Sequence, residues 1–259
     1  MKFAVIRVLK NMNKIIIGTS GYNYKHWANG VFYPHKLSQN KWLEFYSRHF
    51  KAVELNVTFY RLPSKDAFRN WHKRTSKDFI FVIKGNRYIT HIKRLNDSYD
   101  SLKIFSKTID PLIEKIRCVL WQLPPNFQKD SKRLIEFSKN LNKLKLTKLC
   151  RHCFEFRHST WFGKDIYKIL GDFNFSLCIA DSGRWPQEEV ITANFVYLRF
   201  HGGRQLYSSE YSESELKNWV KKAKIWLKQT KMLYAFFNND AYGFAVKNAL
   251  TFRKMLTNK

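Results

Sequence analysis

Apolar and polar residues alternate along residues 52–64, which read AVELNVTFYRLPS. Every second position is apolar, and the positions between carry groups that can hydrogen-bond: Glu54, Asn56, Thr58 and Tyr60. A period of two residues is typical of a β-strand. The strand could lie half-exposed on a surface, or it could belong to a closed barrel and point its polar side chains into the barrel mouth. Only the second geometry predicts polar residues in the same phase near the ends of other strands.

Strand-like and helix-like segments alternate about eight times along the chain. The other predicted strands are 15–17, 79–84, 118–123, 151–157, 175–181, 195–201 and 232–238. The predicted helices are 41–50, 64–74, 97–116, 130–145, 162–170, 212–227 and 241–256. Ser64, Ser212 and Asp240 are the predicted N-caps of three of these helices. Residues Ile89–His91 are expected in a loop. This count favours a single (β/α)8 TIM-like barrel over a doubly wound sheet, with an active site where the strands end.

The phase of polar residues supports the barrel. In the seventh predicted strand Val196, Leu198 and Phe200 form one apolar set, and the other set is Tyr197, Arg199 and His201. The third, fourth, fifth and eighth strands repeat this pattern, whereas Asp181 is placed only by its position at the end of the sixth. The predicted mouth therefore contains Glu54, Asn56, Lys84, Gln122, Glu155, Arg157, Asp181, Arg199, His201 and Asn238.

Buried charges cost several kcal/mol each unless they are paired, so a functional site explains this set better than a structural layer. The alternative is an internal salt-bridge network that makes the rim rigid. The candidate catalytic residues are Glu54, Glu155, Asp181 and His201, of which His201 can titrate near neutral pH. The candidate substrate-binding residues are Asn56, Lys84, Gln122, Arg157, Arg199 and Asn238, where the cations would hold a phosphate or a carboxylate.

The four candidate catalytic residues could instead ligate a divalent metal, as carboxylates and imidazoles commonly do. The cations interleaved with them in the sequence weaken this alternative, because positive charge opposes metal binding.

Composition indicates a folded protein with basic character. The chain has 259 residues, 44% of them hydrophobic, and 47 Lys and Arg against 20 Asp and Glu, a net charge of +27. Such a charge attracts nucleic acid or phosphorylated metabolites, although an overall bias toward lysine would produce it as well. No apolar run is long enough to span a bilayer and no signal peptide is evident, so we expect a cytoplasmic protein without membrane contact. Residues 1–13 read as an N-terminal extension to a barrel domain over 14–259.

Two further features allow alternative interpretations. Cys150 and Cys153 have CxxC spacing, but no second metal-binding motif follows, and we interpret all four cysteines as reduced, buried thiols rather than a redox pair or zinc site. The segment 22–34 is rich in aromatic residues, which fits either a lid that stacks on a ligand or packing over the end of the barrel.

Several ordered motifs resemble the YecE-like family, also called domain of unknown function 72. They are Gly18–Tyr22 with Trp27 and Phe32–Pro34, Val53–Asn56 with Thr58–Ser64, Glu155–Ser159 with Trp161, Tyr197–Gly202, and Phe237–Asp240. The resemblance runs from about residue 14 to the end of the chain. Tyr22 stands where tryptophan is expected, and residues 181–186 fit more loosely. The resemblance implies a (β/α)8 barrel, but it does not imply any particular reaction.

Three functional hypotheses follow. The first is an enzyme that acts on an anionic substrate, either phosphorylated or a nucleic acid, by acid/base or hydrolytic chemistry at the mouth. The second is a non-catalytic nucleic-acid-binding barrel with basic helices and stacking aromatics. The third is an isomerase of small metabolites.

Overall fold

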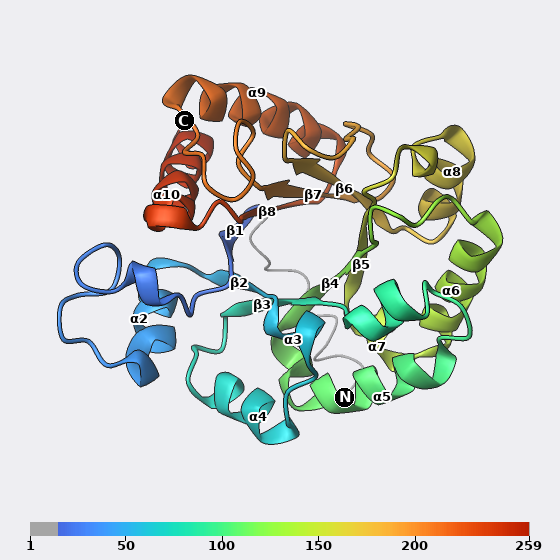
Figure 1. The fold of residues 1–259 in the computed structure, drawn as a ribbon, viewed down its shortest axis with the longest axis horizontal. Helices are drawn as coiled ribbons and strands as arrows, with labels where there is room; N and C mark the ends of the chain where they lie inside the picture. Colours follow the sequence, from blue (N-terminus) through green and yellow to red (C-terminus); the bar gives the residue numbers. More distant parts are fainter. Residues whose placement is uncertain (1–14, 259) are drawn as a thin grey trace.

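A computed structural model of the protein describes residues 15–258, except for the side chain at position 147. Eight parallel strands close into a barrel in chain order (Figure 1). The last strand pairs with the first, with Ile15 opposite Leu233, so the sheet has no free edge. The predicted (β/α)8 barrel is therefore confirmed, whereas the predicted extension over 1–13 lies outside the described residues.

The bounds of the strands are β1 Ile15–Ser20, β2 Ala52–Leu55, β3 Ile80–Lys84, β4 Ile116–Gln122, β5 Arg151–Glu155, β6 Ser176–Asp181, β7 Phe195–Phe200 and β8 Met232–Phe237. β4, β5, β7 and β8 end one or two residues earlier than the sequence predicted, β3 and β6 end as predicted, and β1 continues to Ser20. Arg157, His201 and Asn238 consequently lie just beyond a strand end, in the loops of the mouth.

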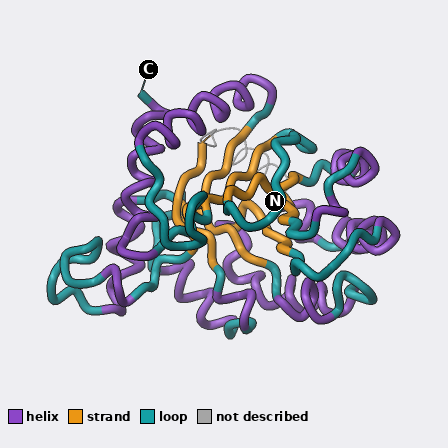
Figure 2. Tube along the Cα trace, turned by 45° about the horizontal axis from the view of Figure 1, so that its top comes forward, coloured by secondary structure: helices purple, strands orange, loops and turns teal. Residues whose placement is uncertain are grey.

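Helices surround the barrel on its outside (Figure 2). They are α2 Trp42–His49, α3 Val57–Tyr60, α4 Lys65–Lys73, α5 Tyr99–Ile109, α6 Ser131–Lys143, α7 Lys145–Leu149, α8 Lys164–Asp172, α9 Glu213–Gln229 and α10 Phe244–Thr257. Between residues 15 and 258 none of them is long and apolar enough to cross a membrane. The predicted caps of α4 and α9 are confirmed: Ser64 Oγ accepts from Ala67 N, and Ser212 forms a capping box with Glu215.

Apolar side chains form two separate clusters. One fills the space between the strands and the helices, and it includes Val196, Leu198 and Phe200 of β7. The other lies inside the barrel and includes Val82, Leu120 and Tyr197. This division confirms the alternation read from the sequence, because residues in the phase of Tyr197 point inward.

The segment 52–64 departs from a strand after four residues. β2 ends at Leu55, and residues 57–60 form the short helix α3. The buried Thr58 hydroxyl can bond the carbonyls of Leu55, at 3.0 Å, and Lys84, at 2.7 Å, which joins the ends of β2 and β3. The alternation beyond Leu55 therefore belongs to a helical turn.

Two local expectations were wrong. Residues 89–91, expected in a loop, lie in the π-helical turn Tyr88–Ile92. Asp240 makes no side-chain capping bond at the turn that precedes α10. Its backbone carbonyl instead accepts a hydrogen bond of 2.9 Å from the indole of Trp27.

The aromatic segment 22–34 packs against the barrel rather than standing free. Trp27 and Tyr33 are fully buried, and Tyr33 stacks on Trp42 with their ring centroids 4.5 Å apart. The packing interpretation therefore holds for these two residues. The four cysteines are free and buried, as expected for thiols of the core.

Candidate active site at the barrel mouth

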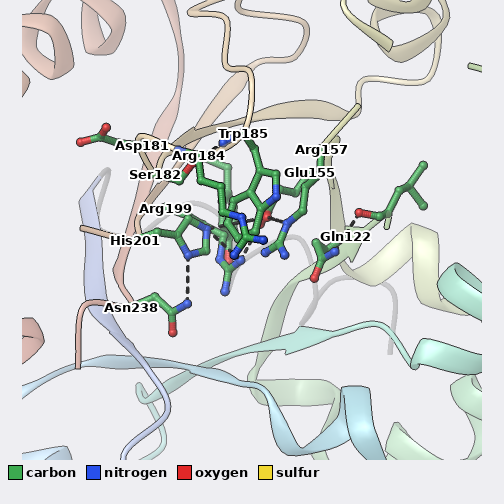
Figure 3. A network of polar contacts seen from close by, with 12 residues as sticks. Gln122, Glu155, Arg157, Asp181, Ser182, Arg184, Trp185, Arg199, His201 and Asn238 are labelled. Carbon is green, nitrogen blue, oxygen red and sulfur yellow. Dashed lines mark hydrogen bonds and ion pairs between the residues drawn. The ribbon is translucent and has the colours of Figure 1, made fainter. Parts of the chain in front are cut away.

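Arg199 on β7 is the centre of a buried ionic network at the carboxyl ends of the strands (Figure 3). Its Nη2 lies 2.7 Å from Oε1 of Glu54, and its Nε lies 3.1 Å from Oε2 of the same carboxylate. Its Nη1 donates to Glu155 on β5. The Tyr197 hydroxyl donates to Glu54 Oε2 at 2.7 Å. One guanidinium thus bridges two carboxylates that come from different sides of the barrel.

Both carboxylates stay ionised because of these contacts. Burial opposes ionisation of Glu54, but Arg199 and the Tyr197 hydroxyl outweigh it and hold the pKa of Glu54 below its usual value. Burial likewise opposes ionisation of Glu155, whereas Arg199 and Arg157 hold the pKa of this carboxyl well below its usual value. Two acids held as carboxylates by cations are better suited to positioning other groups than to donating protons.

Arg157 lies above this layer, nearer to solvent. Its Nε donates to Glu155 Oε1 at 2.8 Å, and its guanidinium carbon lies 3.7 Å from the centroid of a Trp185 ring. The Ser182 hydroxyl accepts from the backbone N–H of Trp185 at 3.0 Å, which holds the tryptophan in place (Figure 3). The Arg157 side chain is 11% exposed, so its remaining N–H groups can meet a ligand that enters the mouth.

His201 is buried between the network and Asn238. Its Nδ1 lies 3.0 Å from the Asn238 amide nitrogen, and its Nε2 lies 3.7 Å from Glu155 Oε1. Burial and then the charge of Arg199 lower the pKa of His201 to about 4. The ring is therefore neutral at physiological pH, and it can accept a proton only from a strong acid or after the network rearranges.

Lys84 at the end of β3 differs from the other cations of the mouth. It is 8% exposed, and its Nζ lies 4.1 Å from the centroid of the Phe59 ring. Burial, followed by the positive charge of Arg199, lowers the pKa of Lys84 to about 7. Near neutral pH this amine can gain or lose a proton.

His91 and Gln122 line the same side of the mouth. The Gln122 amide nitrogen donates to the Leu123 carbonyl at 2.8 Å and lies 3.5 Å from His91 Nε2. Burial and the nearby Lys84 cation lower the pKa of His91 to about 4. Lys84, His91, Gln122 and Arg157 together present donors and a neutral imidazole, without a free carboxylate among them.

Two predicted residues take other positions. The side chain of Asp181 points away from the network (Figure 3), next to Gly203 and in the same outward phase as Ile179. Burial raises the pKa of Asp181. Asn56 lies at the N-terminal end of α3, and its Oδ1 is buried and has no hydrogen-bond partner in the part of the chain that the structure describes. Seven of the other nine predicted residues therefore lie around Arg199, whereas Asp181 points away from them and Asn56 lies at the start of α3.

The predicted metal ligands do not form a metal site. The Arg199 guanidinium occupies the space between Glu54 and Glu155, and Asp181 faces the other way. No group of three or more acidic, histidine or cysteine side chains suited to a metal occurs within residues 15–258. The donor set, with a permanent cation at its centre, fits an anion better than a divalent cation.

A surface cavity of about 210 Å³ lies elsewhere, lined by residues that include Cys150, Arg151 and Asn194. These residues stand at or near the starts of β5 and β7, at the opposite end of the barrel. Because sites in this fold form at the carboxyl ends of the strands, the mouth is the candidate site and this cavity is not.

Three residues of the mouth were not among the candidates. Tyr197 shares the inward phase of Arg199, so the alternation of β7 could have identified it as a partner for Glu54. Trp185 lies in an irregular segment and His91 in a short π-helical turn, and periodicity carries no signal in either.

The fold and the site define a (β/α)8 barrel protein with a buried Arg–Glu network at its mouth. The chain belongs to the family described as "Protein of unknown function DUF72", whose model matches residues 16–259. It is 25% identical to the UPF0759 protein YunF of Bacillus subtilis, over 93% of this chain and 94% of that protein. It is similar to the crystal structure of a DUF72 family protein of Thermotoga maritima, with 31% identity and a TM-score of 0.83, covering 95% of this chain and 100% of the other.

A more distant likeness concerns the fold alone. The structure of SacUVDE covers 95% of this chain and 98% of its own, with a TM-score of 0.55 and 10% identity.

Proposed function

We propose that this protein is an enzyme that binds an anionic substrate at the barrel mouth and carries out acid/base chemistry there. One observation supports this most directly. Lys84 and Arg157 lie at the mouth with His91 and Gln122, while both carboxylates of the site are already paired with Arg199. An incoming phosphate or carboxylate therefore meets cations and neutral donors rather than free acids.

The buried network has a supporting role in this proposal. Glu155, which is itself bonded to Arg199, holds Arg157 from below, and Trp185 covers one face of the Arg157 guanidinium. A guanidinium fixed in this way loses little conformational entropy when it binds an oxyanion. Proton donation would fall to Lys84, because the acids of the network are held as carboxylates and His201 is neutral.

Anion binding can be tested with inorganic phosphate and the variant Arg157→Gln. We expect phosphate to bind the wild-type protein and to bind this variant about 10- to 100-fold more weakly, since a charged hydrogen-bonded contact contributes about 1.5–3 kcal/mol. Titration calorimetry measures both affinities. Arg69→Gln removes an exposed arginine of α4 and is the matched control. Equal affinities of the wild type and Arg157→Gln would contradict the proposal.

Turnover needs a separate assay. The protein is incubated with a panel of phosphorylated sugars and with single-stranded and double-stranded oligonucleotides, and products are detected by mass spectrometry. Conversion by the wild type that is lost in Arg157→Gln supports the enzyme. Oligonucleotide binding without conversion in any sample would favour the second candidate instead.

That second candidate is a nucleic-acid-binding barrel, and the exposed tyrosines favour it. Tyr60, Tyr88, Tyr207 and Tyr242 are 70%, 50%, 37% and 77% exposed, and each lies in a segment that follows the carboxyl end of a strand. Aromatic side chains of this kind stack on unpaired bases, and the net charge of +27 favours the phosphate backbone.

The variants Tyr60→Ala and Tyr242→Ala test this surface. With a labelled single-stranded 20-mer, we expect each to weaken binding by about 1–3 kcal/mol, measured by fluorescence anisotropy. Ile225→Ala, which removes an exposed apolar side chain from α9, should have no effect. Unchanged affinity in both tyrosine variants would exclude base stacking on this rim.

A further inference from the structure

Lys84 is a buried lysine whose amine has no acceptor among residues 15–258: the contact of its Nζ is with the Phe59 ring. Lys115, which is 4% exposed, shows what a structural buried lysine looks like here. Its Nζ donates to the carbonyls of His72 and Thr75 and to the Thr75 hydroxyl, at 2.6 to 3.0 Å. The difference indicates that the amine of Lys84 is kept free for a ligand.

The surroundings of Lys84 favour the neutral amine. The charged and titratable groups near it come from four elements: Glu54 of β2, Glu155 and Arg157 at the end of β5, Arg199 of β7, and His91 of the π-helical turn. Both carboxylates are bonded to arginines, so their charge is compensated. Burial, and then the positive charges of Arg199 and Arg157, outweigh the two carboxylates and lower the pKa of Lys84 to about 7. With a pKa near 7, about half of the Lys84 amine is unprotonated at pH 7, and the unprotonated amine is a nucleophile.

We infer that Lys84 is a nucleophilic amine that forms an imine with the carbonyl carbon of an anionic aldehyde or ketone, whose anionic group is bound by Arg157. This inference rests on the proposed function, which supplies the anion-binding site. It adds the chemical class of the substrate and a covalent step.

The step balances without an oxidant or a reductant. The lone pair of Nζ forms a bond to the carbonyl carbon, and the π electrons of the carbonyl move to its oxygen. The oxygen takes up the two protons that Nζ loses and leaves as water, and a carbon–nitrogen double bond remains. The Phe59 ring lies against Nζ and shields the imine from water, which would reverse the reaction.

The experiment measures the modification of every lysine in the full-length protein. At pH 7 the protein is treated with glyoxylate or with propanal in the presence of cyanoborohydride, which reduces each imine to a stable amine. Peptide mapping by mass spectrometry gives the rate at each lysine. With glyoxylate, we expect Lys84 to react at least about tenfold faster than the exposed lysines, because their usual pKa of about 10.4 leaves them almost fully charged. Lys115 is the matched buried control.

The two aldehydes separate this inference from the proposed function. If both hold, glyoxylate modifies Lys84 faster than propanal does, with each rate taken relative to the exposed lysines in the same sample, and Arg157→Gln removes that preference for glyoxylate. Rapid modification by both aldehydes without a preference for glyoxylate would support the nucleophile but overturn the anion site at Arg157. Phosphate binding that depends on Arg157, with Lys84 no more reactive than Lys115, would leave the proposed function standing and overturn the inference.

Discussion

Arg199 joins two buried carboxylates and is itself 1% exposed, so it is enclosed by the protein rather than open to a ligand. The charges of Glu54 and Glu155 outweigh the effect of burial and raise its pKa well above the usual value. Sequence reasoning assigned Arg199 to substrate binding. From its contacts we propose instead that Arg199 is a positioning residue that orients the groups above it.

Arg199→Met should therefore be strongly destabilising. Without the guanidinium, Glu54 and Glu155 are left buried and uncompensated, and we expect a loss of about 3–5 kcal/mol in the free energy of unfolding. Urea denaturation measures this loss. Arg69→Met breaks an ion pair on the exposed surface of α4 and should change stability little. A similar small change for Arg199→Met would mean that the network does not support the fold.

At the scale of elements, the junction between β2 and β3 sets the position of Lys84. Thr58 of α3 is fully buried, and its hydroxyl bonds the carbonyls at the ends of both strands. Thr58→Val preserves the shape of the side chain but leaves both carbonyls without this partner. We expect a loss of about 1–3 kcal/mol, measured by urea denaturation.

The matched control is Thr108→Val on α5, whose exposed hydroxyl bonds the Ile104 carbonyl. Because water can replace that bond, this variant should change stability by less than about 0.5 kcal/mol. Equal effects of the two substitutions would show that Thr58 does not join the strands.

For the whole molecule, buried histidines should make stability depend on pH. Burial lowers the pKa of His91 and His201 to about 4 and that of His152 to about 3. Between the ordinary pKa of 6.5 and these values, the unfolded chain binds protons that the folded chain does not. Stability should therefore fall as the pH drops from about 6.5 to 4, by up to about 1.4 kcal/mol per pH unit for each of the buried His152 and His201 and by less for the half-buried His91.

Below about pH 4.5 the carboxyls add to this loss, because the folded-state pKa values of Glu54 and Glu155 are lowered and their contribution disappears as they gain protons. Urea denaturation at pH 7, 6, 5 and 4 measures the slope. His201→Asn should reduce the slope of the unfolding free energy against pH by the contribution of one histidine. Substitution of the exposed His49 should leave this slope unchanged. A flat profile above pH 4.5 would contradict the neutral, buried state of these rings.

The sequence alone determined the barrel and most of the inward-facing residues. Alternation reports which face of a strand a residue occupies, and eight alternations of strand and helix leave few other folds. Glu54, Glu155 and Arg199 could be placed in the mouth because their strands keep the phase of the pattern up to their carboxyl ends. Asp181 was wrongly placed in the mouth, because it was assigned from its position at a strand end and not from its phase along the strand.

Only the tertiary structure decided which charges pair. Arg199 meets Glu54 across 145 positions of sequence and Glu155 across 44, and no local pattern encodes such distances. Local sequence also does not show that the amine of Lys84 lacks a hydrogen-bond acceptor, because the side chains around this amine come from other strands. Local periodicity thus fixed the face on which each side chain lies, whereas barrel closure decided its partners and its charge.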